Sequence, residues 1–476
     1  MSKTEKHQLV IIGAGPGGYR AAFMAADLGL KVTLIDPEIN PGGVCLYRGC
    51  IPTKALLHLT KIKADAESAG DMGIHFEKVH IKIDKIREWK NNVVKKLTGG
   101  LGQLVKARKI NYIRGKAKFL SDDLIEVTGD DSNKKQIEFE NAIISTGASP
   151  VKLPEIDTDD PRIMHSAGSL DLENIPGKLL VIGGGYIGLE MSSIYHALGS
   201  KVTLVELTKD LMPGTDSDLV KEYKKANVHT FEQLLLETKV KRVNTKKDKL
   251  EVEFENAKGE KTKKTFDKIL VAIGQKPNTK EIGIEKTGIK TNGKGFIQVN
   301  EQQQTSQKNV YAIGDVTGPP LLAHKASYEG KIAAEVIAGK KAANDAKAIP
   351  SVIYTEPEVA TCGLNENEAK EKGISYKVEK FTWPASGRAV AMNAEKGFTK
   401  TLIDPKTGRI LGAGIVGKNA GDLIAELALA IEMAATAEDI TLTIHPHPTL
   451  SETIMEAAEM FYGTPAHTFV KQKQQK

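Results

Sequence analysis

Two cysteines near the N-terminus, Cys45 and Cys50, are the residues best suited to chemistry, and four residues separate them. A thiol pair at this spacing can form a structural disulfide, bind a metal or act as a redox-active pair. Positions i and i+5 of an ideal helix have Cα atoms about 8–9 Å apart, whereas a disulfide needs them closer than roughly 7 Å. A bond between the two sulfurs therefore requires a bent or loosened helix, which Gly49 and Pro52 permit. A strained disulfide is easier to reduce, but spacing alone leaves a redox pair and an inert pair equally open.

A histidine near the C-terminus is a second candidate. Prolines flank His447 on both sides, and Glu452 follows five residues later. A carboxylate there can hold one imidazole nitrogen, so that His447 can shuttle protons near neutral pH. A histidine merely packed in a proline-rich turn fits the pattern equally well. His445 and His447 could also belong to a metal site, but no other cluster completes one, and we expect no metal.

The cysteine pair comes shortly after a sequence pattern that is typical of a dinucleotide-binding unit. Residues 9–12 are apolar and predict a buried strand, and residues 13–18 form a G-x-G-x-x-G turn that opens a helix. The next strand ends at Asp36, 23 residues after Gly13. Glycines let the backbone approach a pyrophosphate at the helix N-terminus, and the acid stands where a carboxylate accepts from ribose hydroxyls.

The same unit recurs in the middle of the chain. A strand over residues 178–182 leads into a second G-x-G-x-x-G turn, and a strand over residues 201–205 ends at Glu206, again 23 residues after Gly183. An internal repeat is a more specific signal than one glycine turn, and it predicts two dinucleotide sites. Glu206 would accept the ribose 2′-OH and repel a 2′-phosphate, which favours NAD over NADP.

Three further apolar segments are expected to return to the cofactor sites. Residues 142–148 and 270–274 predict strands that end in tight turns, and residues 310–315 predict a strand that ends in Gly-Asp. Asp315 could meet a ribityl or ribose hydroxyl, although a simple turn aspartate fits as well. In the helix expected from residue 321, His324 is more readily explained as a hydrogen-bonded histidine than as a ligand.

Composition limits the remaining possibilities. A chain of 476 residues predicts two to four domains, and 40% hydrophobic with 26% charged residues is typical of globular proteins. Three cysteines form no disulfide framework, which favours a cytoplasmic location. The first apolar strand is too short for a signal peptide or a membrane span. A net charge of +6 spread along the chain, with 5% aromatic residues, argues against nucleic-acid binding.

Two regions outside the repeated units also carry predictions. Residues 74–104 are expected to be mostly helical. From residue 349 strands and helices alternate without another glycine turn, which predicts an α+β domain used for assembly. Cys362 lies in this part and is expected to be a small buried apolar residue.

In order along the chain, the glycine turns, the cysteine pair, the Gly-Asp motif and the C-terminal His-x-x-x-x-Glu resemble the pyridine nucleotide–disulfide oxidoreductase family. The resemblance covers nearly the whole chain. Its most specific motifs are residues 49–54 (GCIPTK) and 445–452 (HPHPTLSE). The second is more similar to the branch that oxidises dihydrolipoamide than to glutathione reductases. Mercuric reductases have extra C-terminal cysteines, which this sequence lacks. Soluble transhydrogenases lack the redox cysteine pair, which this sequence has.

The resemblance implies an α/β fold with two Rossmann-like dinucleotide-binding domains, for FAD and NAD, and a C-terminal α+β dimerisation domain. The expected first part of the FAD-binding domain, with the redox disulfide, is residues 1–150. The NAD-binding domain is expected over residues 151–280, the second part of the FAD-binding domain over 281–348, and the interface domain over 349–476.

The resemblance also implies roles for individual residues. Cys45 would exchange with substrate, Cys50 would lie beside the flavin, and Lys54 would lie near flavin N5. His447 would be a general base oriented by Glu452. The residues expected to bind FAD are Gly13, Gly15, Gly18, Asp36, Gly43, Lys54, Ala117, Thr146, Gly147, Asp315 and Ala323. Those expected at the NAD site are Gly183, Gly185, Gly188, Glu206, Val240 and Gly274.

The implied activity is oxidation of dihydrolipoamide through a Cys45–Cys50 disulfide and FAD, with reduction of NAD⁺ to NADH. The implied partners are lipoyl domains of 2-oxo acid dehydrogenase complexes or the glycine cleavage H protein. A homodimer whose active sites use both subunits is expected, without nucleic-acid or membrane partners. The alternatives are a reductase of another small disulfide and a non-catalytic flavoprotein that serves in assembly.

Some positions depart from the family pattern. Tyr47 stands where asparagine is usual, Gln275 where arginine is usual, and Asp36 where glutamate is commoner. Residues 210–235 also match less regularly. These departures concern tuning of the cysteine loop and control of the NAD site rather than the reaction itself.

Overall fold

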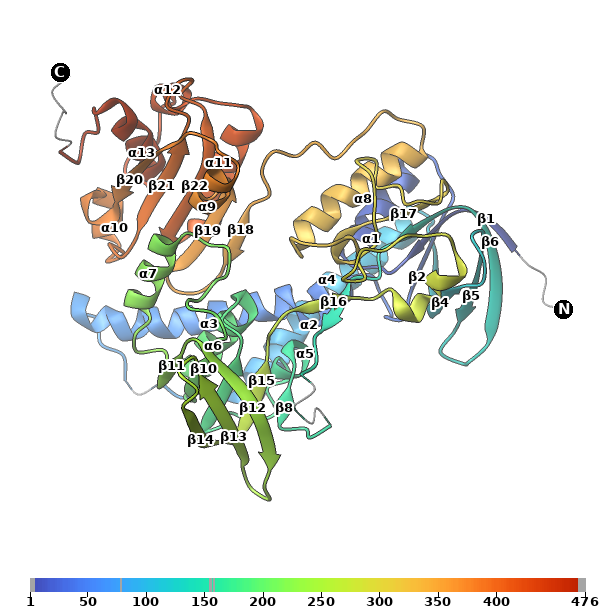
Figure 1. Ribbon diagram of the computed structural model, residues 1–476, viewed down its shortest axis with the longest axis horizontal. Helices are drawn as coiled ribbons and strands as arrows, with labels where there is room; N and C mark the ends of the chain where they lie inside the picture. Colours follow the sequence, from blue (N-terminus) through green and yellow to red (C-terminus); the bar gives the residue numbers. More distant parts are fainter. Residues whose placement is uncertain (1–4, 78, 154–155, 157–158, 470–476) are drawn as a thin grey trace.

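The computed structural model describes residues 5–77, 79–153, 156 and 159–469. Figure 1 shows three bodies: a first dinucleotide-binding unit on the right, a second one below, and a C-terminal domain at the upper left. This arrangement confirms the predicted α/β class. Within the described ranges, every helix is too short or too polar to span a lipid bilayer.

The first unit is built on a sheet of order β3-β2-β1-β6-β5-β4, with β17 also paired to β6. Its central strands run parallel, and the carboxyl-terminal ends of β1 and β6 are apolar and mostly buried. The elements are β1 (Glu5–Ile12), α1 (Pro16–Asp27), β2 (Val32–Asp36), β3 (Asn111–Arg114), β4 (Lys116–Phe119), β5 (Leu124–Thr128), β6 (Lys134–Ile144), β17 (Val310–Ala312) and α8 (Ala323–Ile337).

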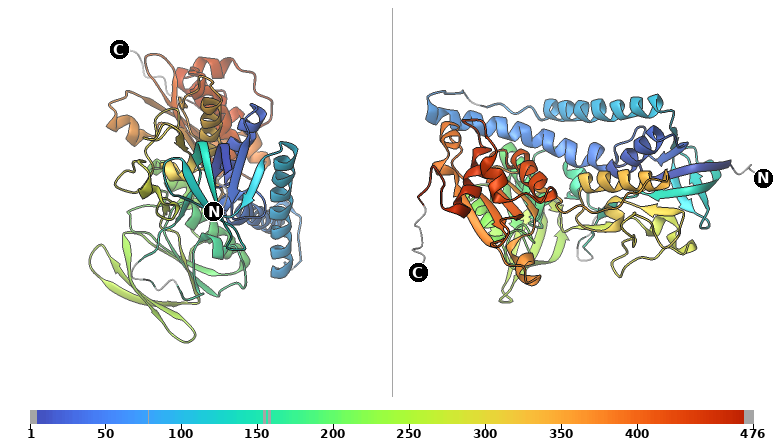
Figure 2. Two further views of the ribbon diagram at one scale, coloured as in Figure 1. Left: turned by 90° about the vertical axis from the view of Figure 1, so that its right-hand side faces the viewer. Right: turned by 90° about the horizontal axis from the view of Figure 1, so that it is seen from above.

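Three helices are inserted between β2 and β3. They are α2 (Gly43–Arg48), α3 (Cys50–Ser68) and α4 (Ile83–Ala107). The two long ones, α3 and α4, lie alongside each other (Figure 2). The prediction that residues 74–104 are mostly helical is confirmed, because α4 covers this range from Ile83 onward. Gly73, at φ +91°, adopts a left-handed conformation that ends the preceding turn.

The second unit repeats this plan in a sheet of order β11-β10-β9-β15-β8. The strands predicted over residues 178–182 and 201–205 have those bounds. A separate antiparallel sheet, β12-β13-β14, packs beside it. The elements are β8 (Ile163–Met164), α5 (Ser166–Ser169), β9 (Lys178–Ile182), α6 (Tyr186–Leu198), β10 (Lys201–Val205), α7 (Ser217–Ala226), β11 (Gln233–Leu235), β12 (Thr238–Thr245), β13 (Leu250–Asn256), β14 (Lys261–Phe266) and β15 (Lys268–Val271).

A short antiparallel ribbon joins the two units. It is formed by β7 (Ala148–Pro150), where the chain leaves the first unit, and β16 (Gln275–Pro277), where it returns. The Thr146 hydroxyl donates to the Asn278 carbonyl at 2.9 Å, and the Asn278 amide donates to the Thr146 carbonyl at 2.9 Å. The first unit is therefore made from two separate parts of the chain.

The C-terminal domain is a five-stranded antiparallel sheet of order β18-β19-β22-β21-β20 with helices packed on it. Cys362 lies in β19 and is 3% exposed, which confirms the prediction of a buried residue. The elements are β18 (Ser351–Ile353), β19 (Glu358–Gly363), α9 (Glu366–Glu371), β20 (Lys377–Thr382), α10 (Gly387–Ala391), β21 (Phe398–Ile403), β22 (Ile410–Gly417), α11 (Ala420–Glu432), α12 (Ala437–Leu442) and α13 (Glu452–Tyr462).

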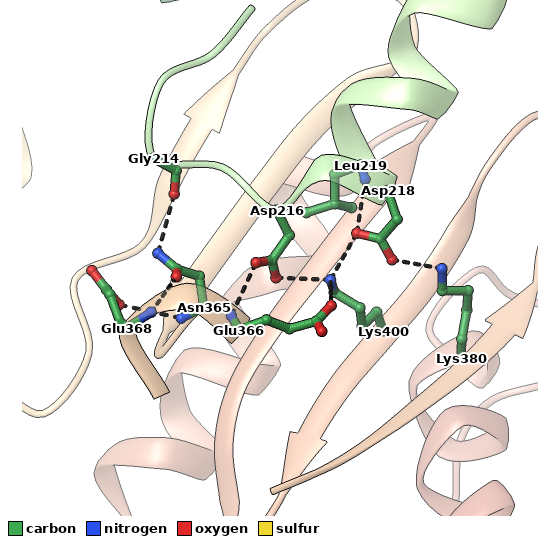
Figure 3. Close-up of polar contacts among 9 residues, drawn as sticks. All are labelled: Gly214, Asp216, Asp218, Leu219, Asn365, Glu366, Glu368, Lys380 and Lys400. Carbon is green, nitrogen blue, oxygen red and sulfur yellow. Dashed lines mark hydrogen bonds and ion pairs between the residues drawn. The ribbon is translucent and has the colours of Figure 1, made fainter. Parts of the chain in front are cut away.

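A buried lysine joins the second unit to the C-terminal domain (Figure 3). Lys400, on β21, is 0% exposed. Its Nζ lies 2.7 Å from Asp216 and 2.8 Å from Asp218, both at the start of α7, and 3.1 Å from Glu366 on α9. Among the described residues these carboxylates are the only trio placed to hold a metal ion. The lysine ammonium already lies among them, so the cluster is an ionic anchor between domains.

Candidate active site

The cysteine pair lies where one helix ends and the next begins. Cys45 belongs to α2 and Cys50 is the first residue of α3. Gly49 between them is outside helical geometry, with φ −145° and ψ −114°. A side chain there would come within 2.9 Å of the Val44 carbonyl oxygen. The helix is thus broken at Gly49, as a bond between the two sulfurs requires.

The two sulfurs are chemically unequal. Both thiols are free and share a hydrogen bond. The bond to Cys45 and the charge of Lys54 outweigh burial and lower the pKa of Cys50 to about 7. The same hydrogen bond, together with burial, raises the pKa of Cys45. Cys50 also stands at the N-terminus of a 19-residue helix, where the macrodipole stabilises a thiolate.

Lys54 is held one turn beyond Cys50 by residues from other domains. Its Nζ donates to both carboxylate oxygens of Glu190, at 3.0 and 2.9 Å. It also lies 4.5 Å from the centre of the Tyr354 ring, and Glu190 accepts from the Tyr354 N–H at 3.0 Å. The sequence predictions did not include Glu190 or Tyr354. A glutamate inside the otherwise apolar start of α6 was the available signal for the first.

The first glycine turn forms a tight cradle. A Cβ on Gly18 would lie 1.9 Å from the Gly13 carbonyl oxygen, and one on Gly43 would lie 2.6 Å from the Gly15 Cα. A Cβ on Gly15 would meet nothing within 4 Å, so this glycine faces open space beside the N-terminus of α1. The glycines allow a close backbone packing that a side chain would prevent. Such a turn next to a helix N-terminus can bind a pyrophosphate. The cradle fits the dinucleotide that the glycine turn predicts, and the family resemblance implies that this dinucleotide is FAD.

Asp36 ties this cradle to the segment after β2. Its carboxylate accepts from the Ala14 N–H at 2.6 Å and from the Glu38 N–H at 2.9 Å. Burial raises the pKa of Asp36, and the two N–H donors offset this only in part. A carboxylate has about four lone-pair sites, so capacity for ribose hydroxyls remains.

The other residues predicted for FAD come from both parts of the first unit. Asp315 lies in a 3₁₀ turn after β17, and burial raises its pKa against the opposing charge of Lys325. Ala323 is the first residue of α8, Ala117 is buried in β4, and Gly147 has φ +69° just after β6. Because β6 and β17 are parallel neighbours, Gly147 and Asp315 follow the same end of the sheet.

The second glycine turn has the same construction. A Cβ on Gly188 would lie 2.0 Å from the Gly183 carbonyl oxygen, and one on Gly185 would face open space. Glu206 accepts from the Gly184 N–H at 2.7 Å and from the Thr208 N–H at 2.8 Å. This geometry fits the predicted NAD.

Two other residues predicted for the NAD site differ in placement. Gly274, at φ +120°, also faces open space. Val240, in β12, is 6% exposed and packs among apolar residues of a hydrophobic core. Its side chain therefore stabilises the fold of the second unit.

His447 and Glu452 form a dyad in the C-terminal domain. The His447 Nδ1 lies 2.8 Å from one Glu452 oxygen, and the other accepts from the Thr449 N–H at 2.6 Å. Burial raises the pKa of Glu452, but the bonds from Thr449 and His447 outweigh it and hold that pKa below its ordinary value. The charged carboxylate orients the ring and leaves Nε2 directed away from the dyad. The side chain of His447 is 73% exposed.

One chain does not bring this dyad to the cysteines. Among the described contacts, His447 bonds to Glu452 and to neither thiol. In Figure 1, α2 lies in the centre of the molecule, whereas α13 lies in the C-terminal domain. His324, on α8, bonds to the Pro350 carbonyl at 2.7 Å, in keeping with its expected structural role. His445 is held by Glu426 at 2.8 Å.

Known families match both parts of the chain. Residues 7–330 match the pyridine nucleotide-disulphide oxidoreductase family, and residues 349–458 match the dimerisation domain of that family. A dihydrolipoyl dehydrogenase of Vibrio cholerae is 49% identical over 98% of this chain and 97% of its own length. One from Geobacillus stearothermophilus is 45% identical over 98% of each chain.

Solved structures agree. LpdA of Mycobacterium tuberculosis superposes with a TM-score of 0.88 at 25% identity, over 95% of this chain and 99% of its own. The HOCl-induced flavoprotein disulfide reductase RclA of Escherichia coli gives 0.85 at 28% identity, over 95% of this chain and 100% of its own. The resemblance inferred from the sequence motifs is confirmed: the chain belongs to the pyridine nucleotide-disulphide oxidoreductase family.

Proposed function

We propose that this protein is a dihydrolipoyl dehydrogenase: it oxidises dihydrolipoamide to lipoamide and reduces NAD⁺ to NADH. The observation that carries the proposal is the unequal thiol pair at the break between α2 and α3. A thiol with a pKa of about 7, beside a lysine and next to a dinucleotide cradle, is built for redox chemistry rather than for structure. The identity of 43–49% to dihydrolipoyl dehydrogenases supports the choice of substrate.

The chemistry of the chain is a thiol–disulfide exchange. His447 Nε2 takes a proton from one substrate thiol, and the thiolate attacks Sγ of Cys45. The Cys45–Cys50 bond breaks, and Cys50 leaves as a thiolate. The second substrate thiol then attacks the substrate sulfur bound to Cys45, which closes the lipoamide ring and frees Cys45. The proton of this second thiol passes to the freed Cys45. Two electrons and two protons thus leave the substrate, and the enzyme holds a Cys45 thiol, a Cys50 thiolate and a protonated His447.

The unequal pKa values direct this exchange. A thiol of low pKa is the better leaving group, so attack at Cys45 with departure of Cys50 is the favoured route. Lys54, fixed by Glu190, keeps positive charge near the Cys50 thiolate. FAD and NAD, when bound, supply the hydride chemistry that carries the electron pair onward. Residues of the two glycine cradles, with Asp36, Asp315 and Glu206, would hold them.

Each active site would use two subunits. The family's dimerisation domain is present over residues 349–458, and the His447–Glu452 dyad belongs to it. Because one chain leaves this dyad apart from the cysteines, we assign the base at each cysteine pair to the second subunit of a homodimer.

The domain limits at residues 150, 280 and 348 and the cytoplasmic location belong to this proposal. So do the lipoyl-domain partners, those of 2-oxo acid dehydrogenase complexes or the glycine cleavage H protein.

A direct assay separates this function from that of a reductase for another disulfide. Purified holoenzyme is tested with dihydrolipoamide and NAD⁺, and in reverse with lipoamide or glutathione disulfide and either NADH or NADPH. We expect turnover with dihydrolipoamide and NAD⁺, and in reverse with lipoamide and NADH, and at least tenfold lower activity with glutathione disulfide or with NADPH. Preference for glutathione disulfide or for NADPH would contradict the proposal. The absence of turnover with every pair would favour a non-catalytic flavoprotein.

A further inference from the structure

The segment after β2 connects the ribose-side carboxylate to the redox helix. We call residues 37–42 the strap. At its start, the Glu38 N–H donates to Asp36 at 2.9 Å. At its end, the Gly42 N–H donates to the Ala14 carbonyl at 2.8 Å, inside the first glycine turn. The strap is therefore fixed at both ends to the dinucleotide cradle, and α2 begins directly after it.

Two residues between the cysteines reach back to this strap. The Tyr47 hydroxyl donates to the Asn40 carbonyl at 3.0 Å and accepts from the Asn40 N–H at 3.2 Å. It thus satisfies both backbone groups of one strap residue. Arg48 pairs with the Glu38 carboxylate at 2.5 Å, but its side chain is 44% exposed. An exposed ion pair contributes little, so Tyr47 is the stronger of the two connections.

The surroundings leave the strap little freedom. A Cβ on Gly102 of α4 would lie 2.1 Å from the Asn40 side-chain oxygen, and one on Gly42 would lie 3.2 Å from the Tyr47 ring. From β3, the Tyr112 hydroxyl donates to the Glu38 carbonyl at 3.0 Å. Tyr112 thus holds the strap from the sheet, whereas Tyr47 holds it from the redox helix.

We propose that Tyr47 is a positioning residue for the cysteine pair: it fixes α2 to the strap and so maintains the geometry in which Cys45 and Cys50 share their hydrogen bond. The inference rests on the proposed redox role of this pair, but not on lipoamide being its substrate. Loss of the hydroxyl loosens α2. The dithiol then loses stability relative to the disulfide, and the Cys50 thiolate loses its hydrogen bond.

The test compares Tyr47→Phe with Tyr112→Phe in the FAD-loaded enzyme. Each substitution removes one tyrosine hydroxyl bonded to the strap, and only the first frees α2. The enzymes are equilibrated in dithiothreitol redox buffers and quenched with iodoacetamide, and the Cys45 and Cys50 peptides are quantified by mass spectrometry. Alkylation of reduced Cys50 is also followed against pH. FAD content and circular dichroism check the fold.

For Tyr47→Phe we expect the equilibrium constant for reduction to fall by about 2- to 12-fold, the factor of one net hydrogen bond. The pH midpoint of Cys50 alkylation should rise. Tyr112→Phe should stay within about twofold of the wild type. A wild-type constant and midpoint in Tyr47→Phe would overturn the proposal, as would an equal shift in Tyr112→Phe. A wild-type enzyme whose cysteines form no disulfide in oxidising buffer would instead refute the proposed function.

Discussion

The two dinucleotide-binding units are nearly identical at their cradles. Gly13 and Gly183 both have positive φ, and a Cβ on either would lie 2.3 Å from a carbonyl oxygen of the returning chain. Asp36 and Glu206 each accept from the second residue of their glycine turn, at 2.6 and 2.7 Å. Asp36, the shorter acid, therefore makes the same contact as Glu206. This departure from the family pattern leaves the contact between acid and glycine turn intact.

The two units differ in the crossover between the acid and the next parallel strand. In the first, the chain makes α2, α3 and α4 before it returns as β3, and these helices carry both thiols and Lys54. In the second, it makes only α7, whose first turn is fixed to Lys400 of the C-terminal domain. The cradle is thus a shared platform. The crossover placed on it differs in what it carries: the thiol pair in the first unit, and the contact with Lys400 in the second.

Removing the reactive thiol of the first crossover should have the largest effect. We expect Cys50→Ser to lower lipoamide turnover by roughly 10⁴-fold or more, since the leaving thiolate is lost, while NAD binding by the second unit persists. Steady-state kinetics and NAD titration measure the two effects. Cys362→Ser is the matched control and should keep activity within about twofold. Substantial turnover in Cys50→Ser would show that the first crossover is not the redox centre.

The base comes next in expected effect. His447→Ala should reduce dithiol oxidation by about 10²–10⁴-fold, the usual loss for a general base, and FAD should stay bound. His229→Ala, in an exposed turn, serves as the control. Loss of FAD from the His447 variant would indicate a structural role. Mixing His447→Ala with Cys50→Ser subunits should restore part of the activity if each site uses both subunits.

A substitution at the contact of the second crossover should lower the stability of the protein. Lys400→Met removes the buried ammonium and leaves Asp216, Asp218 and Glu366 without it. Breaking a buried ion pair in this way costs about 3–5 kcal/mol of unfolding free energy, which denaturant unfolding can measure. Lys380→Met, which removes the more exposed partner of Asp218, should cost about 1 kcal/mol or less. Equal losses would mean that the anchor does not depend on burial.

The smallest effects should separate the two cradles. Gly18→Ala and Gly188→Ala each place a methyl group within about 2 Å of a carbonyl oxygen, and overpacking of this kind costs about 1–3 kcal/mol. The first should weaken FAD retention, and the second should raise the KM for NAD⁺ with FAD retained. Absorbance after gel filtration and NAD⁺ kinetics report these outcomes. If both variants lost only FAD, the assignment of the second cradle to NAD would be wrong.

Local patterns made much of this predictable. Glycine turns, short apolar strands and the cysteine spacing lie within short stretches, so β9 and β10 were predicted to the residue. Contacts between distant segments were not predictable. Lys54 meets Glu190 across 136 residues, and Lys400 meets α7 across 182. Hydrophobic periodicity in the sequence does not reveal such pairings, because they form only when the domains pack together.

Anaerobic titration of the oxidised holoenzyme with dihydrolipoamide tests the central claim most directly. We expect a long-wavelength absorbance from the Cys50 thiolate beside oxidised flavin, followed by stoichiometric NADH when NAD⁺ is added. Because the pKa of Cys50 is lowered to about 7, this absorbance should be full above that pH and fade below it. Dihydrolipoamide that gives neither the absorbance nor NADH, with FAD bound and both cysteines oxidised at the start, would contradict the account.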